Sequence, residues 1–164
     1  MRPGERRGAG LSEPDRLLLE AAIEQARKSE REGGVPIGAA LGTRDGTVVA
    51  VGHNLRVQTG DSTAHAETVC IRHAGRRRDW HQLTLATTLT PCVMCCGAML
   101  LHRIPRVVIG ENHTFEGDEG LIADRGVEVV HAHDLRCVEL MERFITERPD
   151  LWNEDIGVPP EGDG

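Results

Sequence analysis

The spacing of apolar residues predicts where the first helices lie. From Glu13 to Glu32, apolar residues recur with the period of an α-helix, and the pair Gly33–Gly34 ends this predicted helix. A second helix is expected before Gly75, with Thr63 or Ser62 as its N-cap. Both predicted helices lie in the first half of the chain.

Two more helices are expected further along. One begins at Pro91, because proline costs nothing at the first helical position, where the N–H has no intrahelical partner. The other is the final helix, from Asp134 to Glu147. The segment 148–157 that follows is expected to be irregular.

Short runs of apolar and β-branched residues predict strands between these helices. The first two strands are joined by a hairpin turn at Thr43–Thr47. The predicted strands are residues 35–41, 48–54, 83–89, 106–110 and 127–131. Strands that alternate with helices after an opening hairpin indicate an α/β protein with a three-layer αβα architecture, in which helices cover both faces of one sheet.

The chain length is that of a single domain. All the predicted elements fall within residues 12–157 of the 164-residue chain, with no repeat and no long linker. Residues 1–11 predict a flexible leader, and residues 158–164 predict a flexible acidic tail.

Charge and composition narrow the possible functions. A net charge of −7 argues against a surface that coats nucleic acid, and the basic run Gly75–Asp79 is expected to be a solvated loop. No apolar run resembles a secretory signal or a membrane span. The five cysteines are therefore expected in a reducing compartment, the cytoplasm, where clustered Cys and His indicate metal binding or catalysis more often than disulfides.

Four residues at two predicted helix starts carry the candidate chemistry. Cys92 and Cys95 are three positions apart, so their thiols share one helix face, and a helix start favours thiolates. Upstream, the segment "HAE" places His65 and Glu67 at the start of the other helix. Two thiolates and one imidazole make three zinc ligands and leave the fourth position open, as in catalytic zinc sites. Glu67 can then remain off the metal and act on water.

Other interpretations of the cysteines remain open on spacing alone. Cys96 is four residues after Cys92 and could replace Cys95 as the ligand, although packing within the helix is favoured. A thiol–disulfide redox pair would leave His65 and Glu67 unexplained. A structural zinc module would need a fourth ligand, such as His131; for the pair His131 and His133, a position at the surface end of a strand is favoured.

The combination H-x-E…P-C-x-x-C is the signature of zinc nucleobase deaminases. Nearly the whole chain also resembles the fungal-type cytosine deaminases of the cytidine/deoxycytidylate deaminase superfamily. The similar segments are "EGGVPIG", "GHNLR", "HAE", "LTPCVMCCGAM", "IPRVVIGENHTF" and "ERPDLWNEDIG". The resemblance implies the cytidine-deaminase-like fold with a mixed central sheet, one catalytic zinc ion per chain and a homodimer. It also selects Cys95 over Cys96 as the ligand.

The resemblance also implies roles for residues around the substrate. Asn54 would bind the pyrimidine, the backbone N–H of Ala66 would donate to its O2, and Asp155 would meet the base edge or the leaving amine. Phe115 and Trp152 would close over the ring. Two positions depart from the fungal pattern, which has glycine in place of Ala66 and an aromatic residue in place of Val57.

The expected reaction is hydrolytic deamination of a free base, with cytosine giving uracil and ammonia in pyrimidine salvage. Zinc held by His65, Cys92 and Cys95 would activate water, and Glu67 would carry protons from that water to the ring nitrogen and the leaving amine. The alternatives are deamination of guanine or of another aminopyrimidine or aminotriazine. Deamination of adenosine in tRNA is disfavoured, because the net negative charge of the chain does not suit a phosphate-binding surface. The expected partner is therefore a small molecule, with no nucleic acid or membrane involved.

Overall fold

The protein is described here from a computed structural model that covers residues 10–162. Most of the predicted leader (1–11) and the last residues of the predicted tail (158–164) lie outside the described residues. The helices are α1 (Glu13–Arg31), α2 (Arg56–Thr59), α3 (Ala66–Ala74), α4 (Val93–Leu101), α5 (Glu119–Asp124), α6 (Leu135–Glu147) and α7 (Pro149–Asp155), with a short 3₁₀ helix at Trp80–Gln82. The strands are β1 (Gly38–Gly42), β2 (Val48–His53), β3 (Thr84–Leu89), β4 (Arg106–Glu111) and β5 (Glu128–His131).

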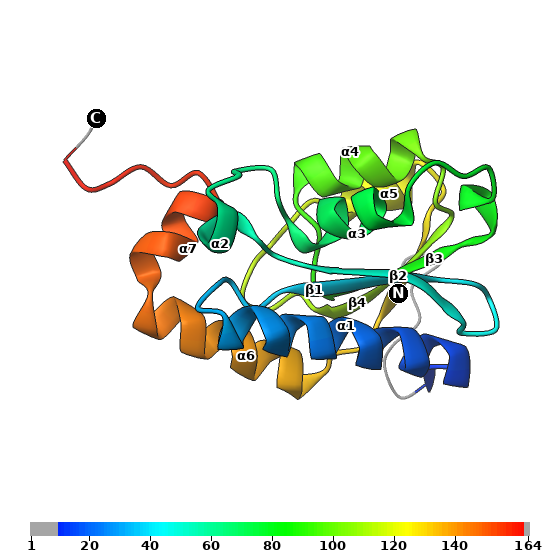
Figure 1. The fold of residues 1–164 in the computed structure, drawn as a ribbon, viewed down its shortest axis with the longest axis horizontal. Coiled ribbons are helices and arrows are strands. Elements are labelled where there is room, and N and C mark those ends of the chain that lie inside the picture. Colours follow the sequence, from blue (N-terminus) through cyan, green and yellow to red (C-terminus); the bar gives the residue numbers. More distant parts are fainter. Residues whose placement is uncertain (1–9, 163–164) are drawn as a thin grey trace.

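One five-stranded sheet in the order β2-β1-β3-β4-β5 forms the middle layer. Strand β1 pairs antiparallel with β2 and β3, while β3, β4 and β5 run parallel. Helices α1 and α6 cover one face, and α3, α4 and α5 cover the other (Figure 1). The predicted three-layer αβα fold with a mixed sheet is therefore confirmed.

Successive side chains of each strand point to opposite faces of the sheet, so the core is divided between these two faces. Ala40, Ala86 and Val108 pack with Leu18 and Ala22 of α1. The neighbouring strand residues belong to the larger cluster under α3 and α4, as expected for side chains that alternate across a strand. The central strand β3 is buried along its whole length, because helices cover both of its faces.

Gly52 determines how closely α3 approaches the sheet. A Cβ atom at this position would lie 2.5 Å from Cys70 N and 2.8 Å from Ala66 O, both in the α3 backbone. The missing side chain allows α3 to lie directly on β2. The start of α3, which carries His65 and Glu67, is thereby fixed against the end of β2, next to Asn54.

Both predicted starts of the central helices need correction. The N-cap of α3 is His65, not Ser62 or Thr63, because the Thr63 hydroxyl bonds to Asp61, Ser62 and Thr63 form a turn, and His65 is the extended residue directly before the helix. The N-cap of α4 is Cys92, so Pro91 lies before the helix and not at its first position. In each case the capping position is occupied by a residue whose side chain faces the same site.

The segment after α6 is also not irregular. Residues Pro149–Asp155 form helix α7, with Pro149 in its first turn and Trp152 buried. This helix lies at the end of the sheet where the turn of α2 lies (Figure 1). The described helices of the chain include none that is long and apolar enough to cross a membrane.

Candidate active site

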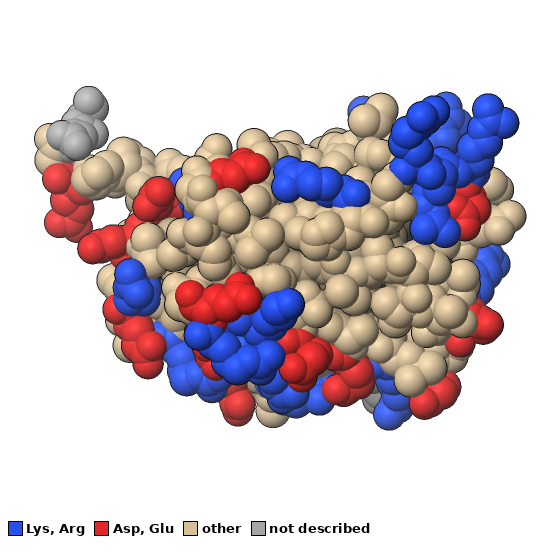
Figure 2. All heavy atoms as spheres, viewed as in Figure 1, with Lys and Arg blue, Asp and Glu red and all other residues tan. Residues whose placement is uncertain are grey.

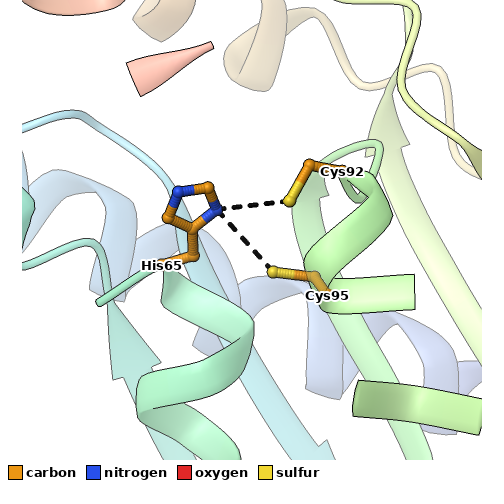
Figure 3. Close-up of side chains that lie close together, drawn as sticks. All are labelled: His65, Cys92 and Cys95. Atoms are coloured by element: carbon orange, nitrogen blue, oxygen red, sulfur yellow. Dashed lines mark hydrogen bonds between the residues drawn. The ribbon is translucent and has the colours of Figure 1, made fainter. Parts of the chain in front are cut away.

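His65, Cys92 and Cys95 form one cluster at the starts of α3 and α4. His65 Nδ1 lies 3.4 Å from Cys92 Sγ and 3.7 Å from Cys95 Sγ, so both thiols face the same ring nitrogen (Figure 3). One ligand atom from each of the three residues lies within 4.8 Å of the others. Within residues 10–162 this is the one such group that could hold a metal ion.

The separations in this cluster fit zinc. Zinc binds thiolates at about 2.3 Å and imidazoles at about 2.0–2.1 Å in tetrahedral sites, which places sulfur and nitrogen about 3.6 Å apart. The two sulfur–nitrogen distances, 3.4 and 3.7 Å, lie on either side of this value. One imidazole and two thiolates are also a donor set that zinc prefers. Three protein ligands leave one coordination position for water or substrate.

The three side chains also change each other's pKa. The hydrogen bond with Cys95 is the main reason that the pKa of Cys92 is lowered to about 4, and His65 lowers it further. The same hydrogen bond, together with burial, raises the pKa of Cys95 far above its usual value. Burial lowers the pKa of His65, but its contacts with Asp155 and Cys92 outweigh burial and raise it to about 10. The lowered pKa of Cys92 favours its thiolate form, which is the form that binds zinc.

Glu67 lies beside this cluster and is almost fully buried, with 4% of its surface exposed. The Thr87 hydroxyl donates to Glu67 Oε1 at 2.6 Å, and Cys95 Sγ lies 3.2 Å from Glu67 Oε2. Burial raises the pKa of the Glu67 carboxyl, and the bond from Thr87 only partly opposes this shift. One oxygen is thus held by β3, while the other faces the metal ligands.

Asp155 of α7 contacts the opposite edge of the His65 ring. Asp155 Oδ1 lies 2.8 Å from His65 Nε2, and only 2% of the Asp155 side chain is exposed. Asp155 Oδ2 also accepts a hydrogen bond from Asn54 Nδ2 at 3.3 Å. Carboxylates in this position fix the orientation of metal-binding histidines.

A cavity of about 390 Å³ opens onto these groups. Phe115 and Trp152 form two of its walls, with ring centroids 5.6 Å apart and planes at 86°. Ala66 lines the cavity at the first position of α3, where backbone N–H groups have no intrahelical partner. Asn54 and Asp155 also line it. Val57 does not line the cavity, so its departure from the fungal pattern lies outside the site.

Hydrogen bonds fasten the end of α7 over this cavity. The Arg56 guanidinium donates to Glu154 O at 3.1 Å and to Glu154 Oε1 at 3.3 Å. Together with the contacts from Asp155 to Asn54 and His65, these bonds join α7 to the segment that precedes α3. Trp152 is thereby held in place as a cover, with 6% of its surface exposed.

The structure thus brings together every site residue that the sequence analysis named: His65, Glu67, Cys92, Cys95, Asn54, Ala66, Phe115, Trp152 and Asp155. Cys96 lies outside the metal cluster, and its thiol faces the carbonyl groups of Pro91 and Asp118. Cys70 and Cys137 are buried thiols.

Sequence reasoning missed two features of the site. It gave no role to Thr87, because a threonine inside a strand is ordinary and no motif marks it. It also missed the contact between Asp155 and His65, because nothing in the sequence relates residues 90 positions apart.

Comparison with known proteins identifies the class. Residues 12–111 match the profile described as the cytidine and deoxycytidylate deaminase zinc-binding region. The chain belongs to this family, whose members are zinc-dependent aminohydrolases.

Within the family, the chain is 46% identical over 145 residues to the cytosine deaminase of Candida albicans, covering 87% of this chain and 97% of that protein. It is 43% identical over 99 residues to the tRNA-specific adenosine deaminase of Bacillus subtilis, covering 58% of this chain and 61% of that protein. The solved structure of a guanine deaminase from Nitrosomonas europaea superposes with a TM-score of 0.64 at 26% identity, covering 80% of this chain and 85% of that one.

Proposed function

We propose that this protein deaminates free cytosine to uracil and ammonia, and that His65, Cys92 and Cys95 hold its zinc ion. The observation that carries the proposal is the placement of Glu67 beside three zinc-type ligands, at a cavity walled by Phe115 and Trp152. Cytosine is favoured among bases because the similarity to the Candida albicans cytosine deaminase extends over almost the full length of both chains.

Zinc, when bound, supplies Lewis-acid chemistry that makes water nucleophilic near neutral pH. Glu67 moves the protons: it accepts one from the attacking water and delivers it to the ring nitrogen, and it then takes the second proton from the oxygen now bonded to C4 and delivers it to the leaving amino group. Overall, a C–O bond forms at C4, the bond between C4 and the amino nitrogen breaks, and ammonia leaves. One carboxylate can serve both transfers because Thr87 fixes Glu67 Oε1 and leaves Oε2 directed at the site.

The remaining cavity residues suit a flat, polar ring. The Ala66 N–H donates to the O2 atom of the base, and Asn54 binds the ring edge. Phe115 and Trp152 provide the apolar faces against which the ring stacks. Asp155 faces the amino group while it also holds His65. A free base offers no ribose or phosphate to bind, so these contacts must supply most of its binding energy.

A panel of substrates tests this assignment. Ammonia release is measured with cytosine, isocytosine, guanine, adenine, cytidine and an aminotriazine under identical conditions. Cytosine is expected to have the highest kcat/KM, and cytidine is expected to react poorly because α7 covers the cavity. A higher kcat/KM for guanine would contradict cytosine as the substrate and leave the aminohydrolase chemistry intact. Turnover of none of these bases would contradict the proposal as a whole.

The surface charge supports a small-molecule substrate rather than RNA. Basic side chains gather where residues 75–82 lie, and the run Arg76–Arg78 is the main contributor (Figure 2). This loop follows the C-terminal end of α3, whereas the zinc ligand His65 caps its N-terminal end. A nine-residue helix is about 14 Å long. The basic loop is therefore not beside the cavity, and the rest of the chain is acidic overall.

The assembly proposed for this protein is a homodimer. Helix α4 has no charged residue, yet Val93 and Leu101 are 61% and 79% exposed, and Leu121 of the adjacent α5 is 37% exposed. An apolar helix face of this kind is normally covered by another protein surface, which we propose is a second copy. Light scattering is expected to give twice the chain mass, and Leu101→Arg is expected to give a monomer. A monomeric wild-type protein at micromolar concentration would contradict the dimer.

The cellular setting proposed is the cytoplasm, with a role in pyrimidine salvage. All five cysteines are free thiols, which suits a reducing compartment. A fluorescent fusion expressed in the source cells is expected to fill the cytoplasm, and secretion of the fusion would contradict this placement.

A further inference from the structure

The C-terminal ends of the three parallel strands converge on one carboxylate, that of Glu119 at the start of α5. His131 Nε2, at the end of β5, lies 2.8 Å from Glu119 Oε1. Asn112 Nδ2, directly after β4, donates to the same oxygen at 3.4 Å. The hydroxyl of Thr90, directly after β3, donates to Glu119 Oε2 at 2.7 Å. Both carboxylate oxygens are therefore engaged by residues from three strands.

The environment favours the charged form of Glu119. Burial raises its pKa, but the hydrogen bonds from His131 and Thr90 outweigh burial and lower the pKa overall. His131 is 7% exposed and Thr90 is 2% exposed. His131 is thus not at the surface, contrary to the sequence prediction, because its ring turns inward to Glu119. A charged carboxylate with buried donors makes stronger hydrogen bonds than a neutral side chain would.

Thr90 connects this group to the zinc ligands. Thr90 and Pro91 immediately precede Cys92, the N-cap of α4. On the other side, the Asp118 N–H donates to Pro91 O at 3.0 Å. The segment between Phe115 and Glu119 is therefore fastened to the segment that carries Cys92 at two successive residues.

Close packing leaves these two segments no room to shift independently. A Cβ atom at Gly117 would lie 2.7 Å from Thr90 Cγ2 and 2.9 Å from Pro91 O. Gly117 also has a positive φ of 63°, which side-chain-bearing residues seldom adopt. Phe115, two residues earlier, is a wall of the cavity. A displacement of Thr90 would therefore move both Cys92, the proposed zinc ligand, and Phe115, the wall against which the base stacks.

We propose that Glu119 and Thr90 are positioning residues that hold the Cys92 segment and the Phe115 segment in one fixed arrangement. Neither side chain reacts with the substrate. Their role deepens the proposed function, because it assumes that Cys92 holds zinc and that Phe115 faces the base. His131 and Asn112 contact Glu119 Oε1 and thereby orient the carboxylate.

Thr90→Val tests this role, because valine keeps the shape of threonine and removes only the hydroxyl group. The zinc-loaded variant is mixed with a chromogenic chelator, and zinc release is followed by absorbance. We expect release about 10-fold faster than from the wild type, the lower end of the range for residues that support metal ligands. With cytosine, we expect KM to rise more than kcat falls, because the wall moves and the proton-transfer group does not.

Two variants serve as controls. Thr90→Ser restores the hydroxyl group and should return zinc release and KM to within about 2-fold of the wild type, well below the 10-fold effect of losing the hydrogen bond. Thr84→Val makes the same change at the other end of β3, at a threonine that is also 2% exposed, and should leave both quantities unchanged. If Thr90→Val does not fold, Glu119→Ala removes the acceptor of the same contact from the other side and should also make zinc release faster.

The zinc measurement needs no substrate, so it can fail independently of the proposed function. Wild-type zinc release and KM in Thr90→Val would overturn the proposal, as would a Thr90→Ser variant that behaves like Thr90→Val. A fall in kcat alone, with zinc release unchanged, would also overturn it.

Discussion

Asp155 Oδ1 lies 2.8 Å from His65 Nε2, on the opposite edge of the imidazole from the two thiols. The carboxylate orients the ring so that Nδ1 faces Cys92 and Cys95. Because Asp155 belongs to α7, the helix that covers the cavity also contacts His65, a proposed zinc ligand. The proposed zinc site and the cover of the cavity therefore share one side chain, that of Asp155.

Asp155→Asn should weaken zinc binding by about 10- to 100-fold, because the replacement removes the negative charge behind the ligand histidine. Competition with a chelator of known affinity measures the effect. Asp150→Asn is the matched control, since Asp150 lies on the same helix and is exposed. Unchanged zinc affinity together with a raised KM would show that Asp155 serves the substrate and not the metal ligand.

Serine substitutions at the three neighbouring cysteines should differ in their effect on zinc content. Cys92→Ser and Cys95→Ser should each lose zinc and activity, because their sulfur atoms face His65 Nδ1. Cys96→Ser should keep about one zinc per chain, as a three-ligand site requires. Atomic absorption on the purified variants provides the measurement. Loss of zinc from Cys96→Ser with retention in Cys95→Ser would reverse the ligand assignment.

Trp152→Ala should raise KM for cytosine by about 5-fold or more, because stacking of a base on an aromatic ring contributes about 1–3 kcal/mol. The opened cavity should also lower the ratio of kcat/KM for cytosine to kcat/KM for cytidine. Trp80→Ala is the control, since Trp80 packs against His102 and does not line the cavity. Steady-state kinetics with both substrates measures the change. An unaltered KM would remove Trp152 from the substrate site.

Much of the fold could be predicted from local pattern. The helix expected over 13–32 is observed at Glu13–Arg31, because apolar spacing and a glycine pair define its face and its end. The ends of the predicted strands lie within about three residues of the observed ends, because runs of apolar and β-branched residues mark the strands. The start of α3 was misplaced, because a capping serine or threonine is the local preference, whereas Ser62 and Thr63 form a turn before the helix and His65 takes the capping position. A longer-range requirement outweighed a local one.

Helix α7 and the contacts of its side chains could not be predicted in the same way. Its seven residues are too few to show a helical period, and Trp152 is buried because it packs against Phe115 and joins the larger core cluster of the assembled fold. Likewise, Glu119 and His131 meet only once β4 and β5 are paired in parallel. Motif spacing predicted the group of His65, Cys92 and Cys95 because each of them lies at a helix start, whereas contacts between distant segments depend on the assembled sheet.

The central claim is that zinc held by His65, Cys92 and Cys95, with Glu67 as the proton carrier, deaminates cytosine. The most direct test measures cytosine deamination and zinc content side by side in the wild type and in Glu67→Gln. The variant should keep its zinc, because the amide replaces no ligand, and should lose about 100- to 10,000-fold in turnover, because it cannot transfer the protons. A Glu67→Gln protein that retains its zinc and turns over cytosine at nearly the wild-type rate would contradict the account.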